Sequence, residues 1–331
     1  MTQPSIIGPP QGRVSDPVLS EFPLPLRRRF FPLGFPLDLE TNSIDVMEAA
    51  SGCWGGYSAR FEDGPVHFSL GVLPGETTVL PAKSTFRARG HLMSVVADAE
   101  NFVAADFDQK FAFGWVTDCV ARDHSLLRYR FLISTAHMLL QQLALAPIHG
   151  ALISRNGHGV ILVGDSFAGK STLAYACARA GWTFICDDGT MLVRKHFNRY
   201  AVGNHQVMHL REDARNLFPE LAEYLPTTRP NGKVGLEILT RDLPIVTAPG
   251  CSIEHVIFLN RNESGQVRLR PYSSRLAMAW FEHVLSFGTT EVLAAQRQAF
   301  ERLVGAGLWE LSYRDLDYAI GRLERLVDLG T

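Results

Sequence analysis

One stretch in the middle of the chain has the residue types that phosphate binding requires. It matches the pattern G-x-x-x-x-G-K-[ST] and reads Gly164-Asp165-Ser166-Phe167-Ala168-Gly169-Lys170-Ser171. In such a loop the glycines let backbone N–H groups point at phosphate oxygens, and the helix that follows adds a favourable dipole. Lys170 is expected to reach the β and γ phosphates, and the Ser171 hydroxyl to bind Mg²⁺. The stretch therefore predicts an ATP and Mg²⁺ site whose contacts extend to Thr172; a glycine-rich turn that only joins a strand to a helix is the alternative.

Two adjacent carboxylates follow the next apolar run. Residues 182–186 read as a strand that leads into Asp187, Asp188 and Gly189. A carboxylate at the carboxyl end of a strand beside a phosphate loop is placed to handle magnesium and the attacking group. Adjacent residues of a regular strand point to opposite faces. Either the strand has ended before the pair, or one aspartate is structural; a plain turn is a further alternative.

The elements around these residues occur in the order that a phosphate loop requires. An aliphatic run at 160–163 predicts a buried strand before the loop, and residues 171–180 predict a helix after it, which Gly181 can end. Asn156-Gly157 predicts a hairpin between strands at 151–154 and 160–163. Before the hairpin we expect a helix over 125–146, ended by Pro147.

From Ile148 to Val193 the chain resembles the catalytic core of HPr serine kinase/phosphorylase. The resemblance is carried by His149-Gly150, the hairpin, the GDSFAGKS loop and the pair Asp187-Asp188. It implies an α/β fold, with an HPr-kinase-type P-loop domain of mixed sheet and flanking helices. It also implies that the aspartates supply a base and a magnesium contact, that Asp187 is the favoured base and Asp188 a metal ligand, and that His149 assists. The family forms hexamers, so a homo-oligomer is an expectation of the resemblance alone.

Three departures from the family pattern shape the expected reaction. Thr172 stands where the family usually has Glu, residues 270–275 hold at best a remnant of its Pro-Gly-Arg-Asn stretch, and residues 209–212 are a loose counterpart of its Glu-x-Arg-Gly signature. These departures tell against HPr as the acceptor and against the phosphorylase reaction. The chain is more similar to divergent HPr-kinase-like proteins, some of which act on peptides. The expected reaction is Mg-ATP-dependent transfer of the γ-phosphoryl group to a hydroxyl, with serine on a protein or peptide favoured. A small-molecule kinase and a non-catalytic ATP-binding regulatory module remain as alternatives.

Composition excludes several other classes. Apolar residues make up 46% and charged residues 20% of the chain, and a net charge of −2 argues against nucleic acid as a partner. The cysteines are scattered without C-x-x-C spacing, which suits a reducing cytoplasm rather than a disulfide framework. The longest apolar run, residues 126–148, is interrupted by polar side chains, so we expect no membrane span.

Changes in residue composition and periodicity along the sequence predict that the chain has three parts. Residues 1–28 are proline-rich and read as a flexible arm, residues 29–122 as a small β-rich α+β domain, and residues 123–331 as the kinase-like domain. The expected elements outside the motif region are a helix at 44–50, strands at 66–72, 85–89, 92–96 and 111–116, a helix at 213–224, strands at 234–239 and 253–259, helices at 274–287 and 291–305, a strand at 308–313 and a helix at 315–329.

For a few further side chains the sequence allows more than one role. His205 and His209 have the spacing of helical metal ligands but lack an intervening carboxylate, so a metal is not favoured. Arg229 and Lys233, in a turn-rich loop, can reach either solvent or a phosphate. Arg270 suits phosphate stabilisation and a surface ion pair equally well.

Overall fold

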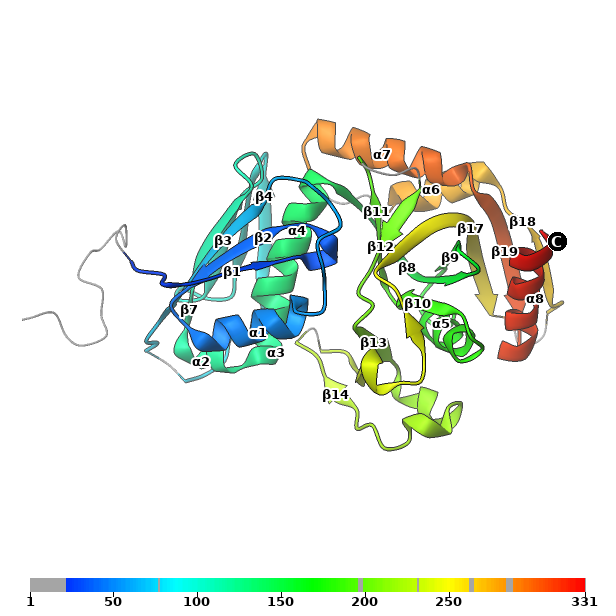
Figure 1. Cartoon of the computed structure of the whole chain (residues 1–331), viewed down its shortest axis with the longest axis horizontal. Helices are drawn as coiled ribbons and strands as arrows, with labels where there is room; N and C mark the ends of the chain where they lie inside the picture. The colour runs from blue at the N-terminus through cyan, green and yellow to red at the C-terminus, as the bar shows by residue number, and fades with distance from the viewer. Residues whose placement is uncertain are drawn as a thin grey trace, which may run out of the picture. The chain divides into compact units, whose positions relative to one another are not determined.

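A computed structural model describes residues 22–330 except 77, 196–198, 231, 262–264 and 284–287. The chain divides into two compact units, Met1–Leu139 and Leu140–Thr331, which are described separately (Figure 1). The sequence placed the domain boundary after residue 122, and the structure divides the chain after Leu139. Most of the expected arm, residues 1–21, lies outside the described residues, and its last residues begin a strand at Leu26.

The first unit is built on one seven-stranded sheet. Its strand order is β1-β2-β3-β7-β6-β5-β4, with β2, β3 and β7 parallel and β7 to β4 an antiparallel meander. The strands are β1 (Leu26–Phe30), β2 (Leu37–Thr41), β3 (Val66–Leu73), β4 (Thr85–Arg89), β5 (Leu92–Val96), β6 (Phe102–Asp106) and β7 (Phe111–Thr117). The four strands expected here are confirmed; β1, β2 and β6 were not predicted. Helices α1 (Ile44–Trp54) and α2 (Asp118–Arg122) accompany the sheet.

The expected helix over 125–146 is broken up and ends early. It consists of α3 (His124–Leu127), a π-helical turn (Arg128–Ile133) and α4 (Ser134–Leu143). Pro147 does not end it, because Pro147 lies inside strand β8 (Leu145–Arg155), opposite Met191 of β11 (Gly189–Val193). A proline is tolerated there because β8 has one paired neighbour at that position and the missing N–H disrupts no second ladder. No helix among the described residues is long and apolar enough to cross a membrane.

The second unit is a mixed α/β structure around a nine-stranded sheet. β8 pairs with β11 through residues 145–149, with β10 (Thr183–Cys186) through residues 152–154 and with β9 (His158–Val163) through residues 150–155, so β10 and β9 flank it on opposite edges beyond Gly150. The predicted hairpin is confirmed, with φ values of 52° and 85° at Asn156 and Gly157. The other strands of this sheet are β12 (Tyr200–Val202), β16 (Val246–Thr247), β17 (Gly250–Arg261), β18 (Arg268–Pro271) and β19 (Gly307–Tyr313).

Helices cover both faces of this sheet. One apolar cluster joins it to α5 (Lys170–Arg179) and α8 (Leu316–Leu329), and a second joins it to α6 (Ser274–His283) and α7 (Thr290–Val304). Alternate residues of β9 enter the two clusters: Val160 and Leu162 face α5, whereas Ile161 and Val163 face the other side. This alternation is what a strand buried on both faces requires. The helices expected at 274–287, 291–305 and 315–329 and the strands at 253–259 and 308–313 are confirmed, except that residues 284–287 lie outside the described residues.

A small three-stranded sheet stands beside this core. Its order is β13-β15-β14, with β13 (Val207–Leu210), β14 (Thr227–Thr228) and β15 (Val234–Leu239). The helix expected over 213–224 is wrong: two short 3₁₀ turns, η3 (Glu212–Asn216) and η4 (Pro219–Leu221), stand in its place. The physical reason is Pro219, which disfavours helical backbone in the residue before it, and Phe218 is accordingly extended.

We expect Phe184→Ala to destabilise the second unit strongly. The ring is fully buried in the cluster between the sheet and α5, so truncation leaves a cavity that costs about 3–5 kcal/mol. The measurement is denaturant unfolding of the whole chain. The matched control is Val246→Ala on the paired strand β16, where the side chain is 62% exposed and the expected change stays within about 0.5 kcal/mol. Equal losses in the two variants would contradict this assignment of the core.

Candidate active site

The phosphate-loop sequence forms a tight connection from β9 to α5. Gly164 and Gly169 take left-handed φ values of 150° and 88°. A Cβ at Gly169 would lie 2.3 Å from the Tyr313 hydroxyl, and one at Gly164 would lie 3.0 Å from the Leu259 carbonyl oxygen. Both glycines are therefore required by backbone conformation and by close packing. The sequence expectation of a strand, a loop and a helix in this order is confirmed.

Tyr313 fixes the loop from a distant part of the chain. Its hydroxyl donates a 2.8 Å hydrogen bond to the carbonyl oxygen of Ala168, and the whole side chain is buried. Tyr313 ends strand β19, which pairs with β17. Sequence reasoning missed this residue, because the signal is a contact between segments 145 positions apart.

Lys170 is held against the loop that precedes it. Its ammonium donates to the carbonyl oxygens of Gly164 at 2.8 Å and Asp165 at 3.1 Å. Burial lowers the pKa of Lys170, and the negative charges of Asp188 and Asp165 partly oppose this effect. Lys170 and Asp188 are therefore close enough to interact electrostatically, as the predicted site requires.

The two aspartates lie in an irregular link between strands. β10 ends at Cys186 and β11 begins at Gly189, so Asp187 and Asp188 are free of strand alternation. Asp187 is buried, with 6% of its side chain exposed, and its Oδ2 accepts a 3.0 Å hydrogen bond from the backbone N–H of His209. Asp188 is half exposed and its Oδ1 lies 2.8 Å from Nδ1 of His149. The two neighbouring carboxylates thus have different environments.

His149 has a carboxylate partner rather than backbone partners alone. It lies on β8 opposite Gly189, and its hydrogen bond is the main cause that lowers the pKa of Asp188 below the ordinary aspartate value. Partial burial of Asp188 works in the opposite direction, and the charges of Lys233 and Lys170 add to the lowering. Asp188 is therefore ionised at neutral pH.

Ser171 connects the helix start to the aspartate link. Its hydroxyl donates a 3.3 Å hydrogen bond to the backbone carbonyl of Asp187. Hydroxyl and carboxylate oxygens are the hard donors that Mg²⁺ prefers, so Ser171 fits the predicted metal, and Asp188 has the chemistry either of a second ligand or of a base. Of the other predicted loop residues, Asp165 and Ser166 are exposed, Ala168 is buried and Thr172 is half-buried in α5.

Two residues that the sequence left open approach the site. His209 lies on strand β13 instead of a helix, so the helical spacing with His205 does not arise. It contacts Asp187 through its backbone, and its Nδ1 lies 3.7 Å from the same carboxylate oxygen. Lys233, from the segment before β15, affects the pKa values of both Asp188 and Lys170. Arg270, in contrast, pairs with Glu310 at 2.7 Å, which is the surface ion-pair alternative.

Phe167 combines an unfavourable backbone conformation with an exposed ring. Its φ is 72°, a region that costs about 1–3 kcal/mol for a residue other than glycine. The side chain is 75% exposed, so burial does not offset this cost. The guanidinium carbon of Arg211 lies 4.3 Å from the ring centroid, a cation–π contact worth about 0.5–1 kcal/mol at an exposed site.

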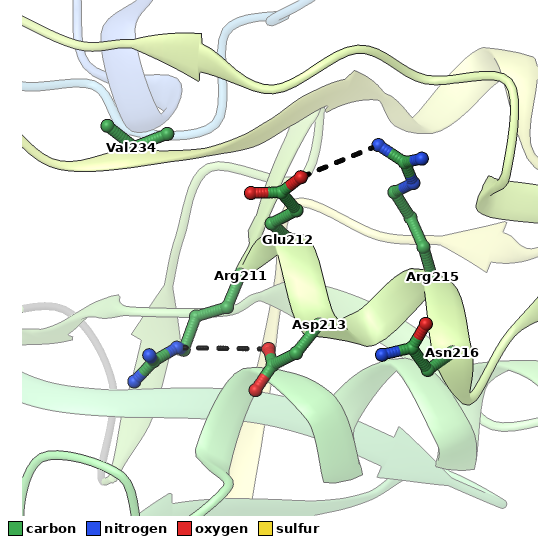
Figure 2. A pocket seen from close by; sticks show the side chains of 6 residues that line it. All are labelled: Arg211, Glu212, Asp213, Arg215, Asn216 and Val234. Carbon is green, nitrogen blue, oxygen red and sulfur yellow. Dashed lines mark ion pairs between the residues drawn. The ribbon is translucent and has the colours of Figure 1, made fainter.

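Arg211 also lines a polar pocket on the segment after β13. Figure 2 shows its ion pair with Asp213 on one side of η3 and the pair of Glu212 with Arg215 on the other, each at 3.8 Å. Asn216 and Val234 complete the lining. The Arg211 guanidinium therefore belongs both to this pocket and to the tip of the phosphate loop.

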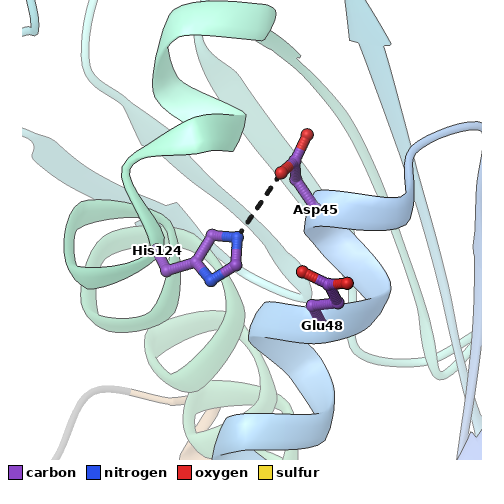
Figure 3. A group of neighbouring side chains, drawn as sticks. All are labelled: Asp45, Glu48 and His124. Atoms are coloured by element: carbon purple, nitrogen blue, oxygen red, sulfur yellow. Dashed lines mark ion pairs between the residues drawn. The ribbon is translucent and has the colours of Figure 1, made fainter.

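A group of possible metal ligands also occurs in the first unit. Asp45 and Glu48 of α1 and His124 of α3 have ligand atoms within 4.8 Å of one another (Figure 3). His124 and Asp45 form a 3.6 Å ion pair, and Glu48 is exposed. A surface ion pair explains this group without a metal.

The family model of SynChlorMet cassette protein ScmC matches residues 115–206, a range that includes the phosphate loop and both aspartates. Among the solved structures that match is the HPr(Ser) kinase/phosphatase from Coxiella burnetii, at 14% identity and a TM-score of 0.29, covering 55% of this chain and 97% of that one. A search of curated proteins returns no match.

We expect Tyr313→Phe to loosen the phosphate loop. The substitution leaves the buried Ala168 carbonyl without its donor, which costs about 1–3 kcal/mol. Denaturant unfolding and the Kd for Mg-ATP measure the effect, and both should worsen. The matched control Tyr318→Phe removes a hydroxyl from α8 and should change neither quantity. Unchanged stability in Tyr313→Phe would contradict the structural role of this bond.

We expect His149→Ala to raise the pKa of Asp188 toward the ordinary aspartate value. A lowered carboxyl pKa stabilises the folded state above the unfolded pKa, and this stability is lost as pH falls through the folded pKa. The half-exposed pair is worth about 0.5 kcal/mol, so the variant should lose that much at neutral pH and progressively less in acid. Carboxyl ¹³C NMR and unfolding at several pH values test this, with His158→Ala as control. A pKa of Asp188 that is unchanged in His149→Ala would refute the assignment.

Proposed function

We propose that this chain is a Mg-ATP-dependent phosphotransferase that moves the γ-phosphoryl group to a hydroxyl. The observation that carries the proposal is the half-exposed Asp188 carboxylate, held 2.8 Å from His149 and within electrostatic reach of Lys170. A nucleotide-binding module would use such a carboxylate only as a magnesium ligand, whereas transfer to a hydroxyl also needs a base, and His149 orients this one. Catalysis of phosphoryl transfer consists mainly of positioning and charge stabilisation, which this arrangement offers.

The phosphate loop and α5 form the proposed nucleotide site. The backbone N–H groups of residues 164–171 and the start of α5 would bind the triphosphate, and Lys170 would contact the β and γ phosphates. Ser171 would bind Mg²⁺, which neutralises charge on the phosphates when it is bound. The Ser171–Asp187 hydrogen bond keeps this hydroxyl in register with the aspartate link.

The different exposure of the two aspartate side chains suggests different roles for them. The sequence favoured Asp187 as the base, whereas in the structure its carboxylate is buried and accepts a hydrogen bond from the backbone N–H of His209. Asp188, with 51% of its side chain exposed, is the carboxylate that an acceptor can approach. We therefore assign the proton-accepting role to Asp188 and its orientation to His149, and assign Asp187 to holding the link in place.

The favoured acceptor is a serine on a protein or peptide. The basis is the sequence resemblance to HPr-kinase-like proteins, together with the open position of Asp188. The described cysteines are free thiols, which suits the proposed cytoplasmic location. A homo-oligomer is proposed from the resemblance only.

We expect Asp188→Asn to abolish phosphoryl transfer while leaving nucleotide binding intact. The variant keeps shape but cannot accept a proton, so transfer should fall at least about 100-fold with the Kd for Mg-ATP within about 3-fold. The assay is γ-labelled ATP with magnesium and a cell extract separated into protein, peptide and metabolite fractions. Asp328→Asn, on the far end of α8 and paired with Arg155, is the control and should keep full transfer. Lys170→Ala should lose nucleotide affinity instead.

The labelled fraction separates the alternatives. Label in protein or peptide that disappears in Asp188→Asn supports the proposal. Label only in metabolites favours a small-molecule kinase with the same core. Tight Mg-ATP binding without any transfer favours an ATP-binding regulatory module and contradicts the proposed reaction.

A further inference from the structure

The backbone at Phe167 marks a position that folding stability does not explain. Among described residues other than glycine, Leu33 also combines a large apolar side chain with positive φ, at 53°. Leu33 is 2% exposed, so burial of its side chain offsets its backbone cost. Phe167 is 75% exposed and receives no such compensation. When no burial offsets the free-energy cost of a strained backbone conformation, the strain points to a function for the side chain.

The Phe167 ring contacts the guanidinium of Arg211, which belongs to a segment that also contacts the aspartate link. Arg211 directly follows β13, and the preceding strand residue His209 donates its backbone N–H to Asp187. The guanidinium thus contacts the tip of the phosphate loop, while the backbone two residues before Arg211 contacts the aspartate link. Its distance to Asp213 is 3.8 Å, longer than a hydrogen bond, so this ion pair leaves the guanidinium donors able to bind another anion (Figure 2).

We infer that Phe167 is a positioning residue that holds the guanidinium of Arg211 where it binds the γ phosphate of ATP. The flat face of the ring supports the planar guanidinium at 4.3 Å and leaves its edge available for two parallel bonds to phosphate oxygens. Glycine at position 167 would relieve the backbone but provide no support. The inference rests on the proposed nucleotide site and deepens it, because it assigns a γ-phosphate contact outside the phosphate loop.

The test is a double-mutant cycle in nucleotide affinity on the full chain. The variants are Phe167→Gly, Arg211→Ala and the double variant, with Phe167→Tyr as the conservative replacement and Arg241→Ala as a control for loss of one exposed positive charge. Calorimetry measures the Kd for Mg-ATPγS and for Mg-ADP, which lacks the γ phosphate. Thermal unfolding is followed for each variant.

Each single variant should bind Mg-ATPγS about 10-fold more weakly and Mg-ADP within about 2-fold of the unchanged chain. The double variant should lose no more than Arg211→Ala alone, because Phe167 acts through Arg211. Phe167→Gly should keep or raise its unfolding temperature, whereas a merely structural role predicts a fall. Phe167→Tyr and Arg241→Ala should behave like the unchanged chain.

Two results would overturn the inference. Phe167→Gly could keep its affinity for Mg-ATPγS, or the losses of the two single variants could multiply in the double variant. No acceptor is needed for these measurements, so they are independent of phosphoryl transfer. If the two residues are coupled but the chain transfers no phosphate, the proposed reaction is refuted and this inference stands. If the chain transfers phosphate but the two residues are not coupled, this inference is refuted and the proposed reaction stands.

Discussion

The site depends on the two-residue link between β10 and β11. Its backbone is held from two directions: Gly150 donates its N–H to the carbonyl of Asp188 at 2.8 Å, and Ser171 donates its hydroxyl to the carbonyl of Asp187 at 3.3 Å. The first bond ties the link to the strand that carries His149, and the second ties it to the helix that follows the phosphate loop. Without these bonds a pair of adjacent carboxylates would be an ordinary surface turn. With them, one carboxylate is fixed inside and the other is presented outward.

Local chemistry made much of this unit predictable from the sequence. Asn156-Gly157 needs positive φ at both positions, which specifies the hairpin, and the glycines of the loop specify the connection from strand to helix. The predictions failed where tertiary context overrides a local rule. Pro147 is a helix breaker by propensity, yet it sits in a strand at a place with a single paired neighbour. Pro219 had the opposite effect, because it interrupts a segment that the sequence predicted to be helical.

The same distinction between local pattern and tertiary context applies to the candidate site. The residues that the sequence identified, Lys170, Ser171 and the aspartates, belong to contiguous motifs whose spacing carries the information. Tyr313 and His209 act through long-range contacts, among them one hydroxyl and one backbone N–H, and no local pattern predicts these contacts. The exposure difference between Asp187 and Asp188 is equally invisible in the sequence, because it is decided by which strand packs over the link.

The pairing of β8 with strands on both of its edges has a geometric consequence. His149 is the last residue of β8 opposite β11, at Gly189, and Gly150 is the first opposite β9, at Val163. The phosphate loop leaves directly after Val163, and Asp188 directly precedes Gly189. The phosphate loop and the aspartate link therefore lie next to the partners of two adjacent β8 residues. The separation between the phosphate loop and the aspartate link is consequently set by the pairing of β8 with β9 and with β11, and a slip of β8 by one residue would displace both and turn His149 to the opposite face.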